Sequence, residues 1–302
     1  MRVLLTGSKG FVGHWLIAHL EAEGDEVIGL DAEVDVTDAG ALRDAVTAAA
    51  PDAVCHLAAL ASVAASFGDS AATYQVNTVG TANLLDAALA CRDRPRVLLV
   101  SSSEVYGRVT PEELPLREDR PFAPVSPYAA SKAAAEMIGL QTWLGSGLEV
   151  IRVRPFNHTG PGQRPDFVVP ALAGQIARAA VSGATQLSTG NLQARRDLSD
   201  VRDVVRAYRL LIEGGRPGEV YNVCRGEAVS ILEVAERLLA LAGVDIPIVV
   251  DPSRVRPVEI PELRGDAGRI ASAVGWKPVY SLDDTLADVL GFWQAGGLAP
   301  TS

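Results

Sequence analysis

The chain has 302 residues, of which 48% are hydrophobic and 21% charged, with a formal net charge of −10 at pH 7. The length predicts roughly two domains around a large core, and the acidic balance argues against nucleic acid as a partner. No stretch approaches the ~20 apolar residues of a membrane span, so no membrane partner is expected. The first residues run directly into an apolar strand without the features of a secretory signal, which predicts a cytoplasmic protein.

Three cysteines, Cys55, Cys91 and Cys224, are widely spaced, and each stands in an apolar setting. An odd number at such spacing fits reduced thiols in the core better than disulfides or a metal site. We therefore assign them no chemistry and expect no metal centre.

A strand, a glycine turn and a helix open the chain. Residues 2–6 (RVLLT) are a short apolar run, Gly7, Gly10 and Gly13 follow, and a helical pattern reaches Glu23. Such glycines let a pyrophosphate approach the amides at a helix N-terminus, where the dipole favours an anion. The first spacing is one residue looser than in many dinucleotide folds, and three glycines can also serve a turn alone. Their place between a strand and a helix favours a dinucleotide site.

A second strand, residues 26–30, ends at Asp31, about 20 residues after the glycines, where an acidic side chain suits the adenosine ribose hydroxyls. Because a carboxylate repels a 2′-phosphate, Asp31 favours NAD(H), with NADP(H) as the alternative; the residue could also be a simple polar strand end. In the next loop, Asp35 is placed near the adenine, and Asp38 is expected to cap the following helix.

Strands and helices continue to alternate. Further strands are predicted at residues 53–57, 96–101 and 149–153, with a long helix at residues 71–90. This alternation predicts an α/β fold with a doubly wound parallel sheet, whose ligands lie at the carboxyl ends of the strands. The small residues 58–61 form a turn that lets a flat cofactor pass closely, although they could equally pack against a helix.

The stretch from Ser126 to Lys132 (SPYAASK) places a phenol and an ammonium one helical turn apart. If Pro127 begins a helix, Tyr128 and Lys132 share a face. A free tyrosine has a pKa of about 10, and a neighbouring cation favours the phenolate, which makes a usable general acid. Such a pair by itself is more often incidental. Residues 101–104 (SSSE) lie at the carboxyl end of a predicted strand, toward which the Pro-rich loop before Tyr128 could fold.

The second half of the chain continues the α/β pattern. Residues 154–163 (RPFNHTGPGQ) are too rich in Gly, Pro and polar groups to continue the sheet. Arg195 and Arg196 face apart on any regular element, so at most one of them reaches a given ligand. Further predicted elements are a helix that Asp203 caps or opens and that runs to Ile212, a strand at 219–223, a helix from Ser230 to Ala242, and a closing helix containing Trp293.

The ordered segments TGSKGFVG, HLAA, SSSEVYG, SPYAASK and RPFNHTGPGQ resemble the extended short-chain dehydrogenase/reductase family over nearly the whole chain. The segments FVVPALAGQIA, GNLQARRDLSDVRDVVRAY, GEVYNVC and RPVEIPELRGD are similar, more narrowly, to GDP-4-keto-6-deoxy-mannose reductases, which make GDP-D-rhamnose. We therefore expect a Rossmann-like domain of residues 1–155 and 198–224, and a smaller C-terminal α/β nucleotide-sugar domain of residues 156–197 and 225–302.

The resemblance also implies roles for residues. Tyr128 would be the proton donor, Lys132 its partner and a ligand of the nicotinamide ribose, and Ser102 the hydroxyl that stabilises the reacting oxygen, while Glu104 stands where dehydratases place a base. The implied cofactor-binding residues are Gly7, Gly10, Phe11, Val12, Gly13, Asp31, Asp35, Val36, Leu57, Ala58, Ala59, Asn77, Tyr128, Lys132 and Pro155. The implied substrate-binding residues are Ser62, Ser103, Asn157, Val169, Arg196, Arg256 and Glu259, with Asn157 and Arg196 at the diphosphate and Arg256 and Glu259 at the nucleotide end.

This pattern predicts an NAD(P)H-dependent reductase of the 4-keto group of GDP-4-keto-6-deoxy-D-mannose, although reductases of this kind often favour NADPH over the NADH that Asp31 suggests. The alternative is a nucleotide-sugar 4,6-dehydratase or 4-epimerase. Ser103 stands where some dehydratases have an aspartic acid, and GDP-mannose dehydratases look similar here, but their segment corresponding to residues 31–38 is longer.

A non-catalytic dinucleotide sensor would have no reason to keep Ser102, Tyr128 and Lys132 together. The helices at residues 71–90 and 128–143 resemble the pair through which this family dimerises, so we expect a homodimer.

Overall fold

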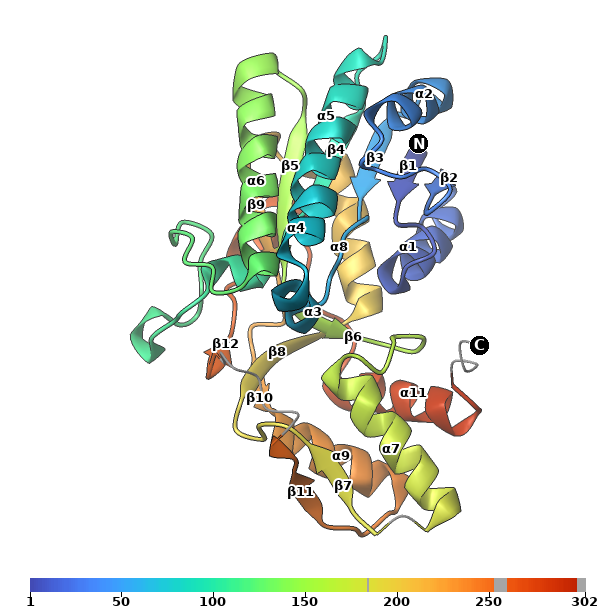
Figure 1. The fold of residues 1–302 in the computed structure, drawn as a ribbon, viewed down its shortest axis with the longest axis vertical. Helices are drawn as coiled ribbons and strands as arrows, with labels where there is room; N and C mark the ends of the chain where they lie inside the picture. Colours follow the sequence, from blue (N-terminus) through green and yellow to red (C-terminus); the bar gives the residue numbers. More distant parts are fainter. Residues whose placement is uncertain (184, 253–259, 298–302) are drawn as a thin grey trace.

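A computed structural model describes residues 1–183, 185–252 and 260–297. A six-stranded parallel sheet, in the order β2-β1-β3-β4-β5-β9, forms the centre of the larger part of the molecule (Figure 1). Its strands are β1 (Arg2–Thr6), β2 (Glu26–Leu30), β3 (Ala53–His56), β4 (Arg96–Val100), β5 (Val150–Pro155) and β9 (Val220–Val223). The predicted doubly wound α/β fold is confirmed.

Helices cover both faces of this sheet. On one face, α1 (Phe11–Ala22) and α8 (Val201–Gly214) bury their apolar sides against β1, β3, β4 and β5. On the other face, α2 (Ala39–Ala49), α5 (Gly80–Ala90) and α6 (Pro127–Ser146) pack on the same strands. Burial on both faces explains why the strands are continuous apolar runs rather than alternating ones.

A smaller part of the molecule has its own sheet and apolar cluster. The sheet contains β6 (Asn157–Thr159), β8 (Arg195–Asp200), β10 (Ala228–Ser230) and β12 (Glu262–Leu263), and β7 (Leu187–Thr189) pairs with β11 (Ile248–Val250). The helices α7 (Val168–Ser182), α9 (Ile231–Ala242) and α11 (Leu282–Gln294) pack together around the cluster, and α10 (Gly268–Val274) packs against the large sheet. None of the helices in the described ranges is long and apolar enough to cross a membrane.

The helix predicted at residues 71–90 is interrupted. The structure has α3 (Val63–Gly68), α4 (Ser70–Tyr74), a π-helical segment η1 (Gln75–Val79) and then α5. A π turn inserts one extra residue and changes which side chains face inward. This turn buries Asn77, whose carboxamide accepts from Leu60 N at 2.8 Å and donates to Leu60 O at 3.1 Å.

The segment 154–163, predicted to be a loop, contains strand structure. The backbone leaves the large sheet after Pro155, and Asn157–Thr159 then pairs in parallel with Leu198–Asp200 of β8. The segment therefore leaves the large sheet, as its Gly and Pro residues predicted. Its pairing with a strand about forty residues later could not be predicted from the residues of the segment itself.

The start of α8 also differs from the prediction. Asp200, and not Asp203, is the N-cap, because its carboxylate accepts from Arg202 N at 2.7 Å. Asp203 lies in the first turn and is buried, where it accepts from the backbone N of Val279 and of Tyr280. The predicted caps Asp38 and Ser230 are confirmed.

Candidate active site

The glycine turn lies between β1 and α1 at the carboxyl edge of the sheet. Gly7 has a φ of +72°, and a Cβ there would lie 2.8 Å from Ala58 N. A Cβ on Gly13 would lie 2.4 Å from Gly7 O, while Gly10 is the N-cap of α1. Glycine is therefore required here, and the first amides of α1, beginning at Phe11, are left uncovered by side chains of the turn. This arrangement fits the pyrophosphate of a dinucleotide.

Asp31 links the end of β2 to the glycine turn. One carboxylate oxygen accepts from Lys9 N at 2.7 Å, and the other accepts from Ala32 N at 2.8 Å. The side chain of Lys9 forms an ion pair with Glu33 at 2.9 Å. The predicted adenosine end of the site therefore contains two carboxylates, those of Asp31 and Glu33. The only ammonium group described beside them, that of Lys9, is paired with Glu33.

The loop after β2 is held from two sides. Asp35 accepts from both the backbone N and the hydroxyl of Thr37 at 2.8 Å, and the backbone hydrogen bond lowers the pKa of its carboxyl. Val36 is buried, and a Cβ on Gly80 of α5 would lie 2.7 Å from its side chain. Asn83 of α5 donates to Val36 O at 3.0 Å. The loop predicted to contact adenine is thus fixed by α5.

The residues predicted to do the chemistry converge at the ends of β4 and α6. Ser126 caps α6 by accepting from Ala129 N at 3.1 Å, and Pro127 is the first helical residue, as expected. Tyr128 and Lys132 are both buried on the side of α6 that faces the sheet. The Ser102 side chain lies close enough to Tyr128 to lower the pKa of the Tyr128 hydroxyl. The structure therefore brings Ser102, Tyr128 and Lys132 together.

Burial controls the protonation of this group. It raises the pKa of Tyr128 to about 12; the neighbouring Ser102 side chain lowers that pKa, and the charge of Glu104 raises it further. Burial lowers the pKa of Lys132 to about 8, and Lys132 Nζ donates to Val100 O at 2.9 Å. Burial is therefore the largest influence on the pKa of Tyr128, and the expected effect of Lys132 on the phenol stays a prediction.

The turn after β3 completes the cofactor side of the site. Leu57 N donates to Thr6 O at 3.2 Å, which holds the turn next to the end of β1, and Ala58 lies against Gly7. Ala59 follows in the same turn, and Pro155 is the buried last residue of β5. These residues all lie at the carboxyl edge of the large sheet, as the sequence predicted.

The predicted substrate residues are more dispersed. Ser62 uses its hydroxyl to cap α3, accepting from Ala65 N at 3.1 Å, and Ser103 is buried in the 3-10 helix η2 (Ser103–Tyr106). Asn157 is exposed at the start of β6, whereas Val169 is buried in the apolar cluster of the smaller part. The structure therefore does not bring the Val169 side chain to open space.

The two adjacent arginines of β8 face apart, as expected. Arg195 forms ion pairs with Glu233 and Glu262, whereas Arg196 is buried and donates to Ile260 O at 2.8 Å. The other two predicted residues, Arg256 and Glu259, lie outside the described ranges.

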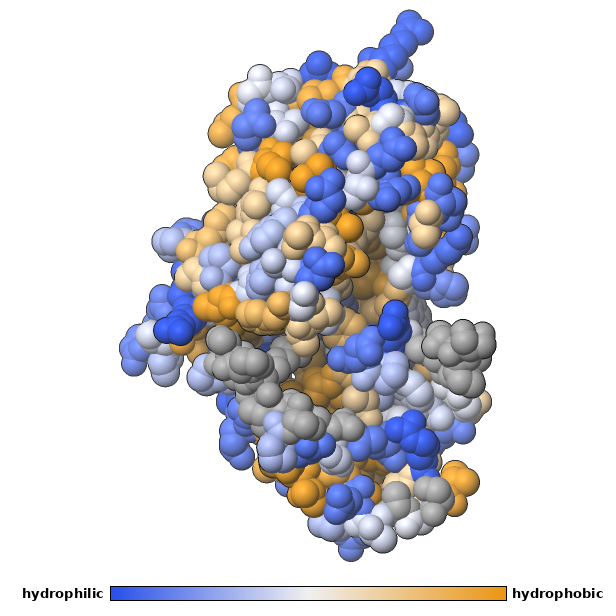
Figure 2. Space-filling model, viewed as in Figure 1, coloured by the Kyte–Doolittle hydropathy of each residue, from blue (hydrophilic) through white to orange (hydrophobic). Residues whose placement is uncertain are grey.

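One aromatic contact between the two parts was not predicted. The ring of His158 on β6 stacks on Phe11, the first residue of α1, with centroids 6.4 Å apart and planes within 8°. Its Nδ1 lies 2.9 Å from Phe156 O. The sequence segment RPFNHTGPGQ contained this histidine, but nothing local indicated which partner it would meet. The surface is hollowed between the two parts near these elements (Figure 2).

A parallel sheet with a glycine turn at its first crossover, and a Ser–Tyr–Lys group at its carboxyl edge, defines the class of extended short-chain dehydrogenase/reductases. Residues 32–289 match the family model described as GDP-mannose 4,6 dehydratase, and the chain belongs to this family.

Individual relatives of this chain have different activities. The chain is 39% identical over 297 residues to the GDP-6-deoxy-D-mannose reductase of Pseudomonas aeruginosa, covering 97% of each. It is 28% identical to human GDP-mannose 4,6 dehydratase, covering 85% of this chain and 74% of the human protein. Among solved structures, RMD from Pseudomonas aeruginosa complexed with NADPH has a TM-score of 0.91 at 40% identity, covering 97% of this chain and 99% of that one.

The UDP-glucose 4-epimerase of Thermus thermophilus in complex with NAD has a TM-score of 0.89 at 29% identity, covering 98% of this chain and 100% of that one. The fold is therefore shared by relatives that are reductases, dehydratases and epimerases. The fold alone therefore does not identify the reaction, and the residues of the site have to be considered for that purpose.

Proposed function

We propose that the protein is an oxidoreductase that reduces the 4-keto group of GDP-4-keto-6-deoxy-D-mannose, giving GDP-D-rhamnose. The observation that carries this proposal is the proximity of the buried side chains of Tyr128, Ser102 and Lys132, in a chain 39% identical over 97% of its length to a GDP-6-deoxy-D-mannose reductase. Together Tyr128 and Ser102 would supply the proton donor and the oxyanion partner that reduction of a ketone requires.

The residues of this chain have distinct tasks in such a reduction. When bound, the nicotinamide cofactor supplies the hydride. Tyr128, with a pKa of about 12, keeps its proton at neutral pH and donates it to the alkoxide that develops at C4. Ser102 donates to the same oxygen and stabilises its charge. Lys132 would hold the ribose of the nicotinamide with its ammonium group.

We propose that the cofactor is bound by the glycine turn, the loop after β2 and the turn after β3. We also propose that NAD(H) is preferred over NADP(H). The support is the pair of carboxylates Asp31 and Glu33 at the adenosine end, since the neighbouring Lys9 is paired with Glu33. A 2′-phosphate placed there would meet like charge. A relative bound to NADPH makes NADP(H) the competing possibility.

The nucleotide-sugar would occupy the hollow between the two parts, with residues 156–197 and 225–302 as its binding domain. Asn157, exposed on β6, and Arg196 on β8 are proposed for the diphosphate. Ser62 and Ser103 would lie nearer the sugar, and Arg256 and Glu259 are proposed for the nucleotide end.

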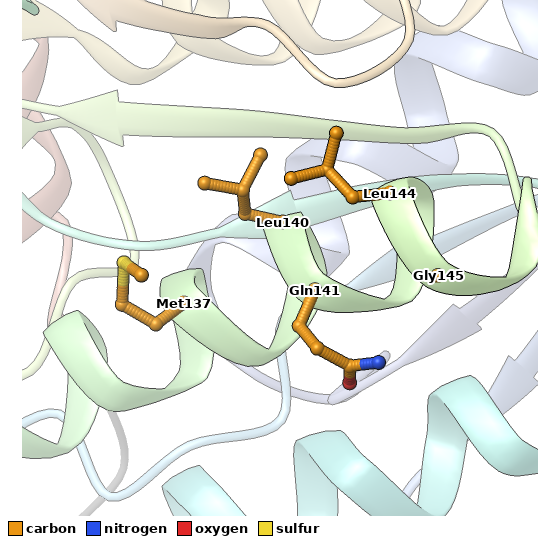
Figure 3. A pocket seen from close by; sticks show the side chains of 5 residues that line it. All are labelled: Met137, Leu140, Gln141, Leu144 and Gly145. Atoms are coloured by element: carbon orange, nitrogen blue, oxygen red, sulfur yellow. The ribbon is translucent and has the colours of Figure 1, made fainter.

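We also propose that two copies associate through α6, in the cytoplasm. Residues 130, 134, 137, 141 and 144 form a stripe at helical spacing on the side of α6 away from the sheet. A shallow pocket along this stripe is lined by Met137, Leu140, Gln141, Leu144 and Gly145 (Figure 3). Leu144 is 73% exposed, and exposed apolar side chains continue on the neighbouring helices at Phe67, Tyr74 and Val79. A second copy would remove this apolar surface from water.

A redox assay tests the proposed reaction. Incubated with GDP-4-keto-6-deoxy-D-mannose and NADH or NADPH, the protein should oxidise one equivalent of cofactor per sugar and release a GDP-6-deoxyhexose. With GDP-mannose and oxidised cofactor it should form no product. Consumption of cofactor without sugar turnover, or no consumption with this substrate, would contradict the proposal.

The second candidate is a 4,6-dehydratase, favoured by the position of Glu104, whose charge acts on Tyr128. A dehydratase returns the hydride to the sugar, so it consumes no external cofactor. Ser103, a buried hydroxyl, is a poor acid for expelling water. Formation of the 4-keto-6-deoxy sugar from GDP-mannose in the same assay would establish this second activity instead.

A further inference from the structure

A buried chain of hydrogen bonds lies behind the site, between the ends of β1 and β3 and the interrupted helix. At its centre is His56, the last residue of β3, which is 2% exposed. Its Nδ1 lies 2.7 Å from Thr6 Oγ1, and its Nε2 lies 3.1 Å from Thr81 Oγ1. None of these three side chains has a task in the reaction described above.

The donors in this chain can be assigned one by one. The Thr81 hydroxyl donates to Asn77 O at 2.6 Å, which uses its single proton. Thr81 Oγ1 therefore accepts from His56, so the proton of the imidazole is on Nε2. Nδ1 of the neutral ring then accepts from the Thr6 hydroxyl, and Thr6 Oγ1 accepts from Ala58 N at 3.3 Å. Each group in this chain therefore donates to the next one, from Ala58 N at one end to Asn77 O at the other.

The ring is held neutral by its surroundings. Burial lowers the pKa of His56 to about 3, and the positive charge of Lys132 on α6 acts in the same direction. A second cation so close to Lys132 would be unfavourable in a dry environment. The assignment of a single ring proton therefore holds across the physiological pH range.

Each end of the chain reaches the proposed site. At one end, Ala58 lies against Gly7 in the cofactor turn. At the other end, the carboxamide of Asn77 donates to Ser131 Oγ at 2.9 Å, and the Ser131 hydroxyl donates to Tyr128 O at 2.7 Å. The chain thus connects the turn proposed to face the cofactor with the first turn of α6.

We propose that His56 is a positioning residue that fixes the cofactor turn relative to the helix carrying Tyr128, acting as a neutral imidazole protonated on Nε2. Its effect on turnover rests on the proposed function, whereas its protonation and its effect on cofactor binding do not. The two ring nitrogens have separate tasks: Nδ1 holds the turn at Ala58 through Thr6, and Nε2 holds Asn77 through Thr81.

Two substitutions separate these tasks. In His56→Asn the amide oxygen can take the place of Nδ1, and in His56→Gln the amide nitrogen can take the place of Nε2. We expect His56→Gln to weaken cofactor binding at least fivefold while changing kcat by less than threefold. We expect His56→Asn to lower kcat at least tenfold with cofactor affinity within threefold. Equal losses in both quantities for both variants would contradict the proposal.

A matched threonine pair controls for the loss of a buried hydroxyl. Thr81 on α5 and Thr142 on α6 are both buried, and each donates to a carbonyl four residues earlier, but Thr142 receives no bond from a histidine among the described contacts. Thr81→Val should lower kcat about tenfold, and Thr142→Val should leave it within twofold. The same effect from both would overturn the assignment.

The protonation state can be read without substrate or cofactor. In protein labelled with nitrogen-15 at histidine, the His56 signals, assigned by their loss in His56→Gln, should show a proton on Nε2 only, and the ring should stay neutral from pH 5.5 to pH 8.5. A proton on Nδ1, or titration within this range, would refute the inference whatever the substrate of the enzyme. Failure of the sugar assay alone would leave this result intact and count only against the proposed function.

Discussion

Lys132 Nζ donates a hydrogen bond of 2.9 Å to the carbonyl oxygen of Val100, the last residue of β4. The ammonium group is therefore anchored to the carboxyl end of the sheet, where the proposed ligand lies, while burial lowers its pKa to about 8. A buried cation destabilises the folded chain, and this destabilisation has a testable pH dependence.

The first prediction concerns stability. An unfolded lysine titrates near 10.4, so between pH 8 and about 10.4 the unfolded chain holds a proton that folded Lys132 has lost. The unfolding free energy of the wild type should therefore rise with pH in this window, relative to Lys132→Met, by about 3 kcal/mol. Urea unfolding at pH 7.5 and pH 10.4 measures the difference.

The control for this experiment is Lys9→Met, because the Lys9 side chain is 72% exposed. Its stability difference from the wild type should change far less over the same pH range. A Lys132→Met difference that is independent of pH would show that the lysine has an ordinary pKa in the folded protein.

The second prediction concerns the proton donor. Tyr128→Phe keeps the buried ring but removes the hydroxyl, so turnover should fall ~10²-fold or more, the usual scale of general acid catalysis. Cofactor affinity should stay within about twofold. Tyr221→Phe is the control, since Tyr221 lies on β9 and its buried hydroxyl accepts from Arg216 N in the turn before that strand, away from the site. Near wild-type turnover in Tyr128→Phe would remove this residue from the mechanism.

The third prediction concerns cofactor choice. Fluorescence titration should show tighter binding of NADH than of NADPH. Asp31→Asn removes one negative charge and should shift the ratio of the two affinities about tenfold toward NADPH, equivalent to ~1.4 kcal/mol of repulsion. Glu26→Gln, at the opposite end of the same strand, should leave the ratio unchanged. Tenfold tighter NADPH binding by the wild type would mean that other groups hold the phosphate.

The fourth prediction concerns assembly. Sedimentation should give the mass of two chains at micromolar concentration, and Leu144→Arg should give one, because it places a charge in the apolar stripe of α6. Val181→Arg, at a 90% exposed position on α7, should leave the mass unchanged. A wild-type mass of a single chain would exclude the proposed dimer.

Much of the site was predicted because its chemistry depends on short stretches of sequence. The Gly7 turn, the acidic end of β2 and the Tyr128–Lys132 spacing are each set by backbone sterics or helix periodicity over a few residues. The strands of the large sheet agree with their predicted ranges within two residues at either end. A resemblance to known sequences extended these local patterns to roles for single residues, which await the experiments above.

The sequence by itself determined the order of strands and helices, the glycine turn and the residues able to donate and hold a proton, because these follow from local propensity and spacing. Only the tertiary structure decided that Asn77 lies in a π turn, that Asn157–Thr159 pairs with β8, and that His56 bonds Thr6 and Thr81. Thr6 and His56 are fifty residues apart in the chain, and nothing near either residue specifies the other. Such contacts arise only when the packed sheet and helices bring distant polar groups into a dry interior, where each must find a partner.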